Sequence, residues 1–159
     1  MILYLLRHAE AEPHCNNDSA RHLTVHGKSQ AAQMGAFCQK FQIKPQVVLT
    51  SPLCRTVETM HPVLEKIEGP PFFELTWIAS GMTPEVAIEE LQSYIMLESV
   101  MLIGHEPDLS YLIAKLLGMA HSENVNVPKA SLTAIKVEKM AAGAGVLQFL
   151  IPVELANGK

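Results

Sequence analysis

The amino-acid sequence predicts an α/β fold, a three-layer sandwich in which a largely parallel central sheet is flanked by helices. Two observations predict it. Short apolar runs of strand length alternate along the chain with longer segments in which apolar residues recur at helical spacing. Two further strand-like segments close the chain around a glycine-containing turn, which is typical of a hairpin at one edge of a sheet. The pattern does not determine the order of the strands.

The predicted strands are apolar runs that each stop at polar or turn-forming residues. Gly69-Pro70-Pro71 marks one break in the chain, and the turn at 141–145 joins the closing pair of strands. The predicted strands cover residues 2–6, 46–50, 72–75, 99–103, 130–138 and 146–153.

Helices are predicted between the strands from caps and apolar stripes. Thr24 is an N-cap candidate for the first helix, and Thr83-Pro84 is a cap followed by a first-turn proline for the third. The fourth helix has an apolar stripe from Leu109 to Leu117 and is closed by Gly118.

The second helix is predicted from its prolines. Pro52 is expected at its first position, where the missing N–H costs nothing, so that Arg55 falls on its first turn. Pro62 is expected to kink or restart this helix, because a proline inside a helix removes one backbone hydrogen bond.

Composition predicts one ordinary globular domain over residues 1–159, with 48% apolar residues, 18% charged residues and a formal net charge of -4. No run of lysine or arginine is present, which disfavours nucleic-acid binding. The first apolar run is too short to span a bilayer, and no signal-peptide pattern precedes it. We therefore expect a cytoplasmic protein without membrane association, and a monomer.

Arginine is scarce: only Arg7, Arg21 and Arg55 occur among twelve basic residues. Arginine offers a planar fork of donors that binds phosphate or carboxylate through two hydrogen bonds, which lysine cannot do. Because each of the three lies near a predicted strand end or in a loop, they are candidates for binding an oxyanion.

Polar residues follow three of the predicted parallel strands. Arg7-His8 ends the first, Ser51 to Arg55 follow the second, and Gly104-His105-Glu106 follow the strand at 99–103. Parallel strands place their carboxyl ends at the same edge of a sheet, where ligands bind in open α/β folds. We therefore expect these residues to meet.

Two histidines with two or three arginines make a site for a phosphoryl group. The guanidinium groups would neutralise its oxygens, and a neutral imidazole could attack phosphorus in line. The ordinary pKa of histidine is near 6.5, so much of it is nucleophilic at neutral pH. Neither a metal nor another cofactor is then required, because the arginines take over the electrostatic role.

Four separated motifs resemble those of the histidine phosphatase superfamily, the phosphoglycerate-mutase-like group, and the match is closest to its short SixA-type phosphohistidine phosphatases. The resemblance covers residues 1 to about 118, and Ala9 stands where the family usually has Gly. The motifs are Leu6-Arg7-His8-Ala9-Glu10-Ala11-Glu12, Arg21-x-Leu23-Thr24-x-x-Gly27, Ser51-Pro52-x-x-Arg55-x-x-x-Thr59 and Gly104-His105-Glu106-Pro107.

The resemblance implies a role for each matching residue. His8 would be the nucleophile and would be transiently phosphorylated, while Arg7 and Arg55 would hold the phosphoryl oxygens. His105 would donate to the same group and stabilise the transition state, and Arg21 would complete the pocket. The implied partner is a histidine-phosphorylated protein of a phosphorelay or phosphotransferase system.

Glu106 has two interpretations. Larger relatives protonate the leaving oxygen of stable phosphate esters with a carboxyl acid, and Glu106 occupies the position of that acid in one branch of the superfamily. A carboxylate at the start of a helix also interacts favourably with the helix dipole. A site poor in general acid suits phosphohistidine, because imidazole leaves readily once solvent has protonated it, whereas an alkoxide does not.

Three functions are therefore considered. The first is a phosphohistidine phosphatase, and the second is a phosphomonoesterase of small metabolites that would use Glu106 as its acid. The third is a non-catalytic phosphate-binding module, although binding alone needs only the arginines and not both histidines. A metal site is not expected, since the spacing of one local cluster matches no zinc motif: His14, Cys15, Asp18, His22 and His26.

Overall fold

The computed structural model of the protein describes residues 1–13 and 18–156. Its sheet has six strands in the order β3-β2-β4-β1-β5-β6, and β5 is antiparallel to both of its neighbours while the other pairs are parallel. The strands are β1 (Ile2–Arg7), β2 (Val47–Thr50), β3 (Phe72–Glu74), β4 (Ser99–Gly104), β5 (Leu132–Val137) and β6 (Gly145–Ile151).

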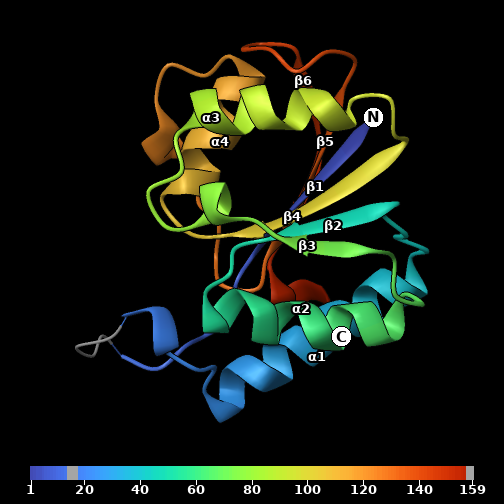
Figure 1. The fold of residues 1–159 in the computed structure, drawn as a ribbon, viewed down its shortest axis with the longest axis vertical. Helices are drawn as coiled ribbons and strands as arrows, with labels where there is room; N and C mark the ends of the chain where they lie inside the picture. Colours follow the sequence, from blue (N-terminus) through green and yellow to red (C-terminus); the bar gives the residue numbers. More distant parts are fainter. Residues whose placement is uncertain (14–17, 157–159) are drawn as a thin grey trace.

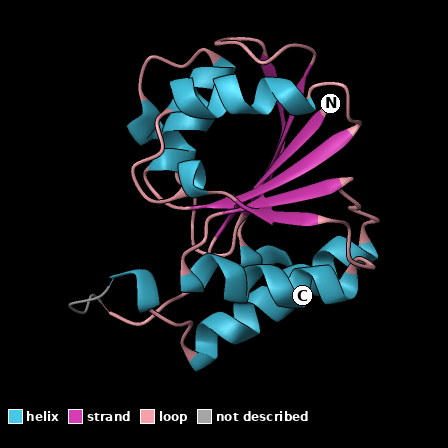
Figure 2. Ribbon diagram, in the orientation of Figure 1, coloured by secondary structure: helices cyan, strands magenta, loops and turns pink. Residues whose placement is uncertain are grey.

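The helices form a layer on each face of this sheet (Figure 1). On one face lie α1 (Val25–Lys40), α2 (Cys54–Lys66) and the short α5 (Val153–Ala156). On the other lie α3 (Pro84–Leu91) and α4 (Asp108–Leu117), as Figure 2 also shows. The predicted three-layer sandwich is confirmed, and so is the closing hairpin, with β6 at one edge of the sheet.

The two central strands are buried on both faces. In β1, Leu3 and Leu5 pack toward α3 and α4, whereas Leu6 packs toward α1 and α2. In β4, neighbouring residues divide in the same way between the two layers. Successive side chains of a strand point to opposite faces, so a continuous apolar run is what a strand covered by helices on both sides requires.

The predicted helix caps are present. The Thr24 hydroxyl accepts a hydrogen bond from the Gly27 N–H at 2.9 Å, and the Thr83 hydroxyl accepts one from the Val86 N–H at 3.3 Å. Gly118 ends α4 with a φ of 70°, the left-handed conformation that glycine adopts without strain.

The predicted start of α2 is wrong. The helix begins at Cys54 with Leu53 as its N-cap, so Pro52 lies in the turn before it. The reason is local, since the Ser51 hydroxyl accepts a hydrogen bond from the Leu53 N–H and forms a tight turn. The helix does not restart at Pro62, since it runs without a break from Cys54 to Lys66.

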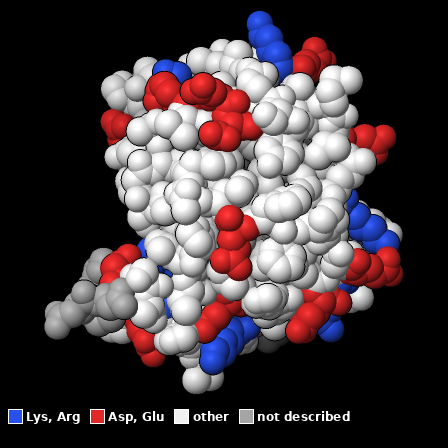
Figure 3. Space-filling view, viewed as in Figure 1, with Lys and Arg blue, Asp and Glu red and all other residues white. Residues whose placement is uncertain are grey.

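No described helix is both long enough and apolar enough to cross a membrane. On the face of the molecule seen in Figure 3, lysine and arginine side chains are separated by acidic ones and form no continuous basic surface.

Candidate active site

The carboxyl ends of β1, β2 and β4 lie at one edge of the sheet and bring the predicted residues together. Arg7 pairs in register with Gly104, and Thr50 pairs with Ile103. The residues that follow these strands are therefore neighbours, and the rings of His8 and His105 lie with their centroids 5.3 Å apart. The predicted meeting of the three strand ends is confirmed.

A cavity of about 460 Å³ opens at this edge. All five residues predicted for the site line it, and the most buried are His105 and Arg55, each 2% exposed, and His8, 6% exposed. The lining residues that bear on the chemistry are Arg7, His8, Asp18, Arg21, Arg55, Ser80, His105, Glu106 and Lys129.

His8 is held in one tautomer. Its Nδ1 lies 2.7 Å from the carbonyl oxygen of Ala9, and because a carbonyl can only accept, Nδ1 carries the proton. Burial lowers the pKa of His8 to about 3, against the Ala9 hydrogen bond, and His105 and Arg55 lower it further. The ring is therefore neutral at physiological pH, with an unprotonated Nε2.

His105 is the second neutral imidazole. Burial and then the charge of Arg55 lower its pKa to about 3. Its Nε2 lies 2.8 Å from the Ser51 hydroxyl oxygen, while its Nδ1 has no hydrogen-bond partner among the described residues. A neutral imidazole in this position can donate one hydrogen bond to an anion without repelling a cation.

Arg55 is positioned from the first turn of α2. Its Nη2 donates to the Ser80 hydroxyl at 3.2 Å and to a carboxylate oxygen of Asp18 at 3.1 Å. The Thr59 hydroxyl donates to the Arg55 carbonyl at 2.6 Å and accepts from the Ala9 N–H at 3.0 Å. Thr59 thus connects the helix that carries Arg55 to the segment that carries His8.

Asp18 bridges two of the arginines. One carboxylate oxygen accepts from Arg21 Nε at 2.7 Å and the other from Arg55 Nη2. Its slight burial raises the pKa of Asp18, but the charges of Arg55 and Arg21 lower it more, so the carboxylate is ionised. An anionic group is thus already placed between guanidinium groups, which shows that this arrangement can bind an oxyanion.

Glu106 lies in the cavity wall and at the start of α4. Its carboxylate accepts hydrogen bonds from the Ser110 N–H, at 3.1 Å, and from the Ser110 hydroxyl. Burial raises the pKa of Glu106, and the Ser110 hydrogen bonds and the charge of Arg7 oppose that rise. Both sequence interpretations of Glu106 therefore have a structural basis.

Lys129 and Ser80 were not predicted from the sequence. Lys129 precedes β5, and because β5 is antiparallel to β1, its beginning meets the carboxyl end of β1. Burial and then the charges of Arg7 and Arg21 lower the pKa of Lys129, which places a further cation among the arginines. Knowing that β5 pairs with β1 would have identified Lys129, but the sequence pattern left the strand order open.

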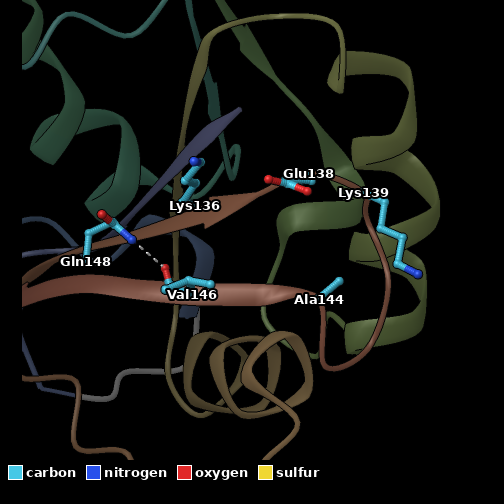
Figure 4. A pocket seen from close by; sticks show the side chains of 6 residues that line it. All are labelled: Lys136, Glu138, Lys139, Ala144, Val146 and Gln148. Carbon is cyan, nitrogen blue, oxygen red and sulfur yellow. Dashed lines mark hydrogen bonds between the residues drawn. The ribbon is translucent and has the colours of Figure 1, made fainter.

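A larger hollow, of about 740 Å³, lies elsewhere on the molecule (Figure 4). It sits on the β5–β6 hairpin near the end of β5, and Lys136, Glu138 and Lys139 are its charged residues. No histidine or arginine lines it, and it contains none of the predicted residues. The smaller cavity is therefore the one with chemistry suited to a phosphoryl group.

Comparison with known proteins decides the family. The family model of the histidine phosphatase superfamily (branch 1) matches residues 3–76. A phosphohistidine phosphatase SixA homolog from Haemophilus influenzae is 31% identical over an alignment of 131 residues, and the match covers 74% of this chain and 78% of that protein. The chain belongs to the histidine phosphatase superfamily. This histidine phosphatase is accordingly a phosphoric hydrolase, as the resemblance of its motifs implied.

Solved structures show the same fold. The protein histidine phosphatase SixA complexed with tungstate superposes with a TM-score of 0.88 at 21% identity, over 96% of this chain and 97% of that one. The α-ribazole phosphatase from Shigella flexneri superposes with a TM-score of 0.77 at 20% identity, over 94% and 96%. Because proteins named for different substrates share this fold, the fold does not select the substrate of this histidine phosphatase.

Proposed function

We propose that this histidine phosphatase removes phosphate from a histidine-phosphorylated protein through a phosphorylated His8. The observation that carries the proposal is the pair of buried imidazoles, His8 and His105, held 5.3 Å apart beside three arginines. Because Nδ1 of His8 carries the proton, Nε2 keeps the lone pair and would be the nucleophile.

The reaction would proceed in two steps. In the first, His8 Nε2 forms a bond to phosphorus while the P–N bond of the substrate breaks, and the leaving imidazole takes a proton from solvent. In the second, water attacks the phosphorylated His8, inorganic phosphate leaves, and Nε2 is free again. Arg7, Arg21 and Arg55 would hold the phosphoryl oxygens in both steps, and His105 would donate a hydrogen bond to one of them.

Asp18 would have to release the arginines when the phosphoryl group binds, since its carboxylate bridges Arg21 and Arg55. Lys129, which also lines the cavity, would supply an additional positive charge. The relatives named as phosphohistidine phosphatases, and the binding of tungstate by one of them, support the choice of a phosphoryl group on histidine.

A phosphomonoesterase of small metabolites is the alternative, and one observation favours it. Glu106 lines the cavity with a pKa raised by burial, which is what a general acid for an alkoxide leaving group requires. Its two hydrogen bonds from Ser110 favour the other interpretation, in which Glu106 serves mainly to begin α4.

The experiment is to measure phosphate release, with EDTA present, from a histidine-phosphorylated carrier domain and from a small phosphate ester. Wild type, His8→Ala and Glu106→Gln are compared. We expect rapid release from the carrier by the wild type, none by His8→Ala, and nearly full activity by Glu106→Gln.

Two results would contradict the proposal. Hydrolysis of the ester but not of the carrier, with loss of that activity in Glu106→Gln, would assign the protein to the metabolite phosphatases. Tight binding of the phosphorylated carrier without any turnover would indicate a phosphate-binding module.

A further inference from the structure

Three side chains that the catalytic proposal does not use come together beside the cavity: His22, Cys54 and Glu58. Their potential ligand atoms all lie within 4.8 Å of one another. His22 Nδ1 is 2.6 Å from Glu58 Oε1 and 3.8 Å from Cys54 Sγ, so it contacts both. Of the sequence cluster considered for a metal, His14 and Cys15 lie outside the described residues, and His22 belongs to this other group.

The local structure explains why these three meet. Cys54 and Glu58 are four residues apart on α2, which places them on the same face of the helix one turn apart. His22 comes from the segment before α1, and this segment is held against α2 because the Leu23 N–H donates to Glu58 Oε2 at 2.7 Å. That hydrogen bond also fixes the orientation of the Glu58 carboxylate, as outer hydrogen bonds do for metal ligands.

We propose that His22, Cys54 and Glu58 form a Zn²⁺ site. A thiolate, an imidazole and a carboxylate are the ligand types that zinc takes in proteins, and three protein ligands leave the fourth position for water. Zinc bond lengths of about 2.0 to 2.3 Å place tetrahedral donor atoms about 3.3 to 3.6 Å apart. The His22–Cys54 separation is already close to that, and His22 and Glu58 need to separate by less than about 1 Å as the metal replaces the proton between them.

A zinc ion bound at this position would hold two segments of the chain together. His22 follows Arg21 and Cys54 precedes Arg55, so a bound ion would fasten the segment that carries one phosphate-binding arginine to the helix that carries the other. Zinc would here be a clamp beside the cavity, not a participant in the reaction. The zinc proposal does not depend on the identity of the phosphorylated substrate.

The test uses the full-length protein and measures metal binding directly. Co²⁺ is added first, because a cobalt–thiolate bond gives an intense near-ultraviolet absorption band, and Zn²⁺ affinity is then obtained by competition with a chromogenic chelator. Wild type is compared with Cys54→Ser and with His121→Ala. His121 is a matched control, since it is an exposed histidine that also contacts a glutamate, Glu123.

We expect the cobalt–thiolate band in wild type and His121→Ala, and its loss in Cys54→Ser. Zinc affinity should fall by about a hundredfold or more in Cys54→Ser. Zinc should also raise the melting temperature of wild type but not of Cys54→Ser, since an ion stabilises the folded state that binds it.

A band that persists in Cys54→Ser, or a wild type that gives no band and no melting shift with zinc, would overturn the assignment. These readouts need no phosphatase assay, so failure of the zinc site and failure of the proposed function are distinguishable.

Discussion

Arg55 shows how single residues build the electrostatics of this site. Its side chain is almost fully buried, donates to Ser80 and Asp18, and contributes to the lowered pKa of both His8 and His105. Burial alone disfavours the charged imidazolium, and a nearby guanidinium disfavours it further. One arginine thus binds the Asp18 carboxylate and also helps to keep His8 and His105 unprotonated.

Arg55→Lys should therefore lower kcat/KM by about a hundredfold or more, because an ammonium group loses the two-pronged contact of the guanidinium. The measurement is steady-state turnover on the best substrate, with thermal unfolding to show that the variant is folded. Near-normal turnover by a folded Arg55→Lys would show that turnover does not need the paired hydrogen bonds that a guanidinium group donates.

At the scale of elements, α1 packs unusually closely on the segment after His8. A Cβ built on Gly27 would lie 1.9 Å from the Glu10 carbonyl oxygen, which is backbone and cannot rotate away. Glycine at this position lets the first turn of α1 touch that segment, where the Thr24 hydroxyl also donates to Glu10 Oε1 at 2.6 Å. The spacing Thr24-x-x-Gly27 in the sequence thus has a packing cause.

Gly27→Ala should destabilise the protein by about 1 to 3 kcal/mol, although alanine favours helices, because the added methyl group overpacks this contact. Urea unfolding measures the loss. Ser29→Ala, at an exposed position of the same helix, is the matched control and should stay within about 0.5 kcal/mol of wild type. Equal stability of Gly27→Ala and wild type would mean that α1 is not held tightly there.

The elements also show which parts of the site could be predicted. Parallel strands place their carboxyl ends at the same edge of a sheet, and this rule is enough to bring four of the residues together. They are Arg7, His8, Arg55 and His105. The rule does not locate Lys129, because Lys129 precedes β5, which is antiparallel to β1. The rule does not locate Ser80 either. The loop that carries Ser80 is held in place by the Asp108 carboxylate, which accepts a hydrogen bond from the Gly81 N–H at 2.8 Å. Such a tertiary contact leaves no periodic pattern in the sequence.

At the scale of the whole molecule, the sheet is covered by helices on both faces, and the candidate site lies at the carboxyl ends of β1, β2 and β4. Continuous apolar runs predicted the layers well, because a strand buried on both sides has no polar face. The start of α2 was predicted less well, because the turn from Ser51 to Leu53 takes precedence over the preference of Pro52 for a first helical position.

Burying two neutral imidazoles makes the stability of the molecule dependent on pH. The pKa values of His8 and His105 are about 3 in the folded chain, whereas an unfolded histidine has a pKa near 6.5. Below about pH 6.5 the unfolded chain binds protons that the folded chain does not. Stability should therefore fall as the pH falls from about 6.5 toward 3, by up to about 1.4 kcal/mol per pH unit for each imidazole.

Urea unfolding at pH 7 and pH 5 tests this dependence. His105→Gln should lose less stability than wild type between the two values, whereas His121→Gln, at an exposed position, should behave as wild type does. An unchanged pH dependence in His105→Gln would show that the pKa of this ring is the same in the folded protein as in the unfolded chain.

The central claim, that His8 carries the phosphoryl group during turnover, is tested most directly by trapping the intermediate. The enzyme is mixed with a histidine-phosphorylated carrier domain, quenched in alkali within the first turnover, and mapped by peptide mass spectrometry. We expect phosphate on His8 that rises and then decays, and none on the enzyme in His8→Asn. Turnover without phosphate on His8, or phosphate on another side chain, would contradict the account.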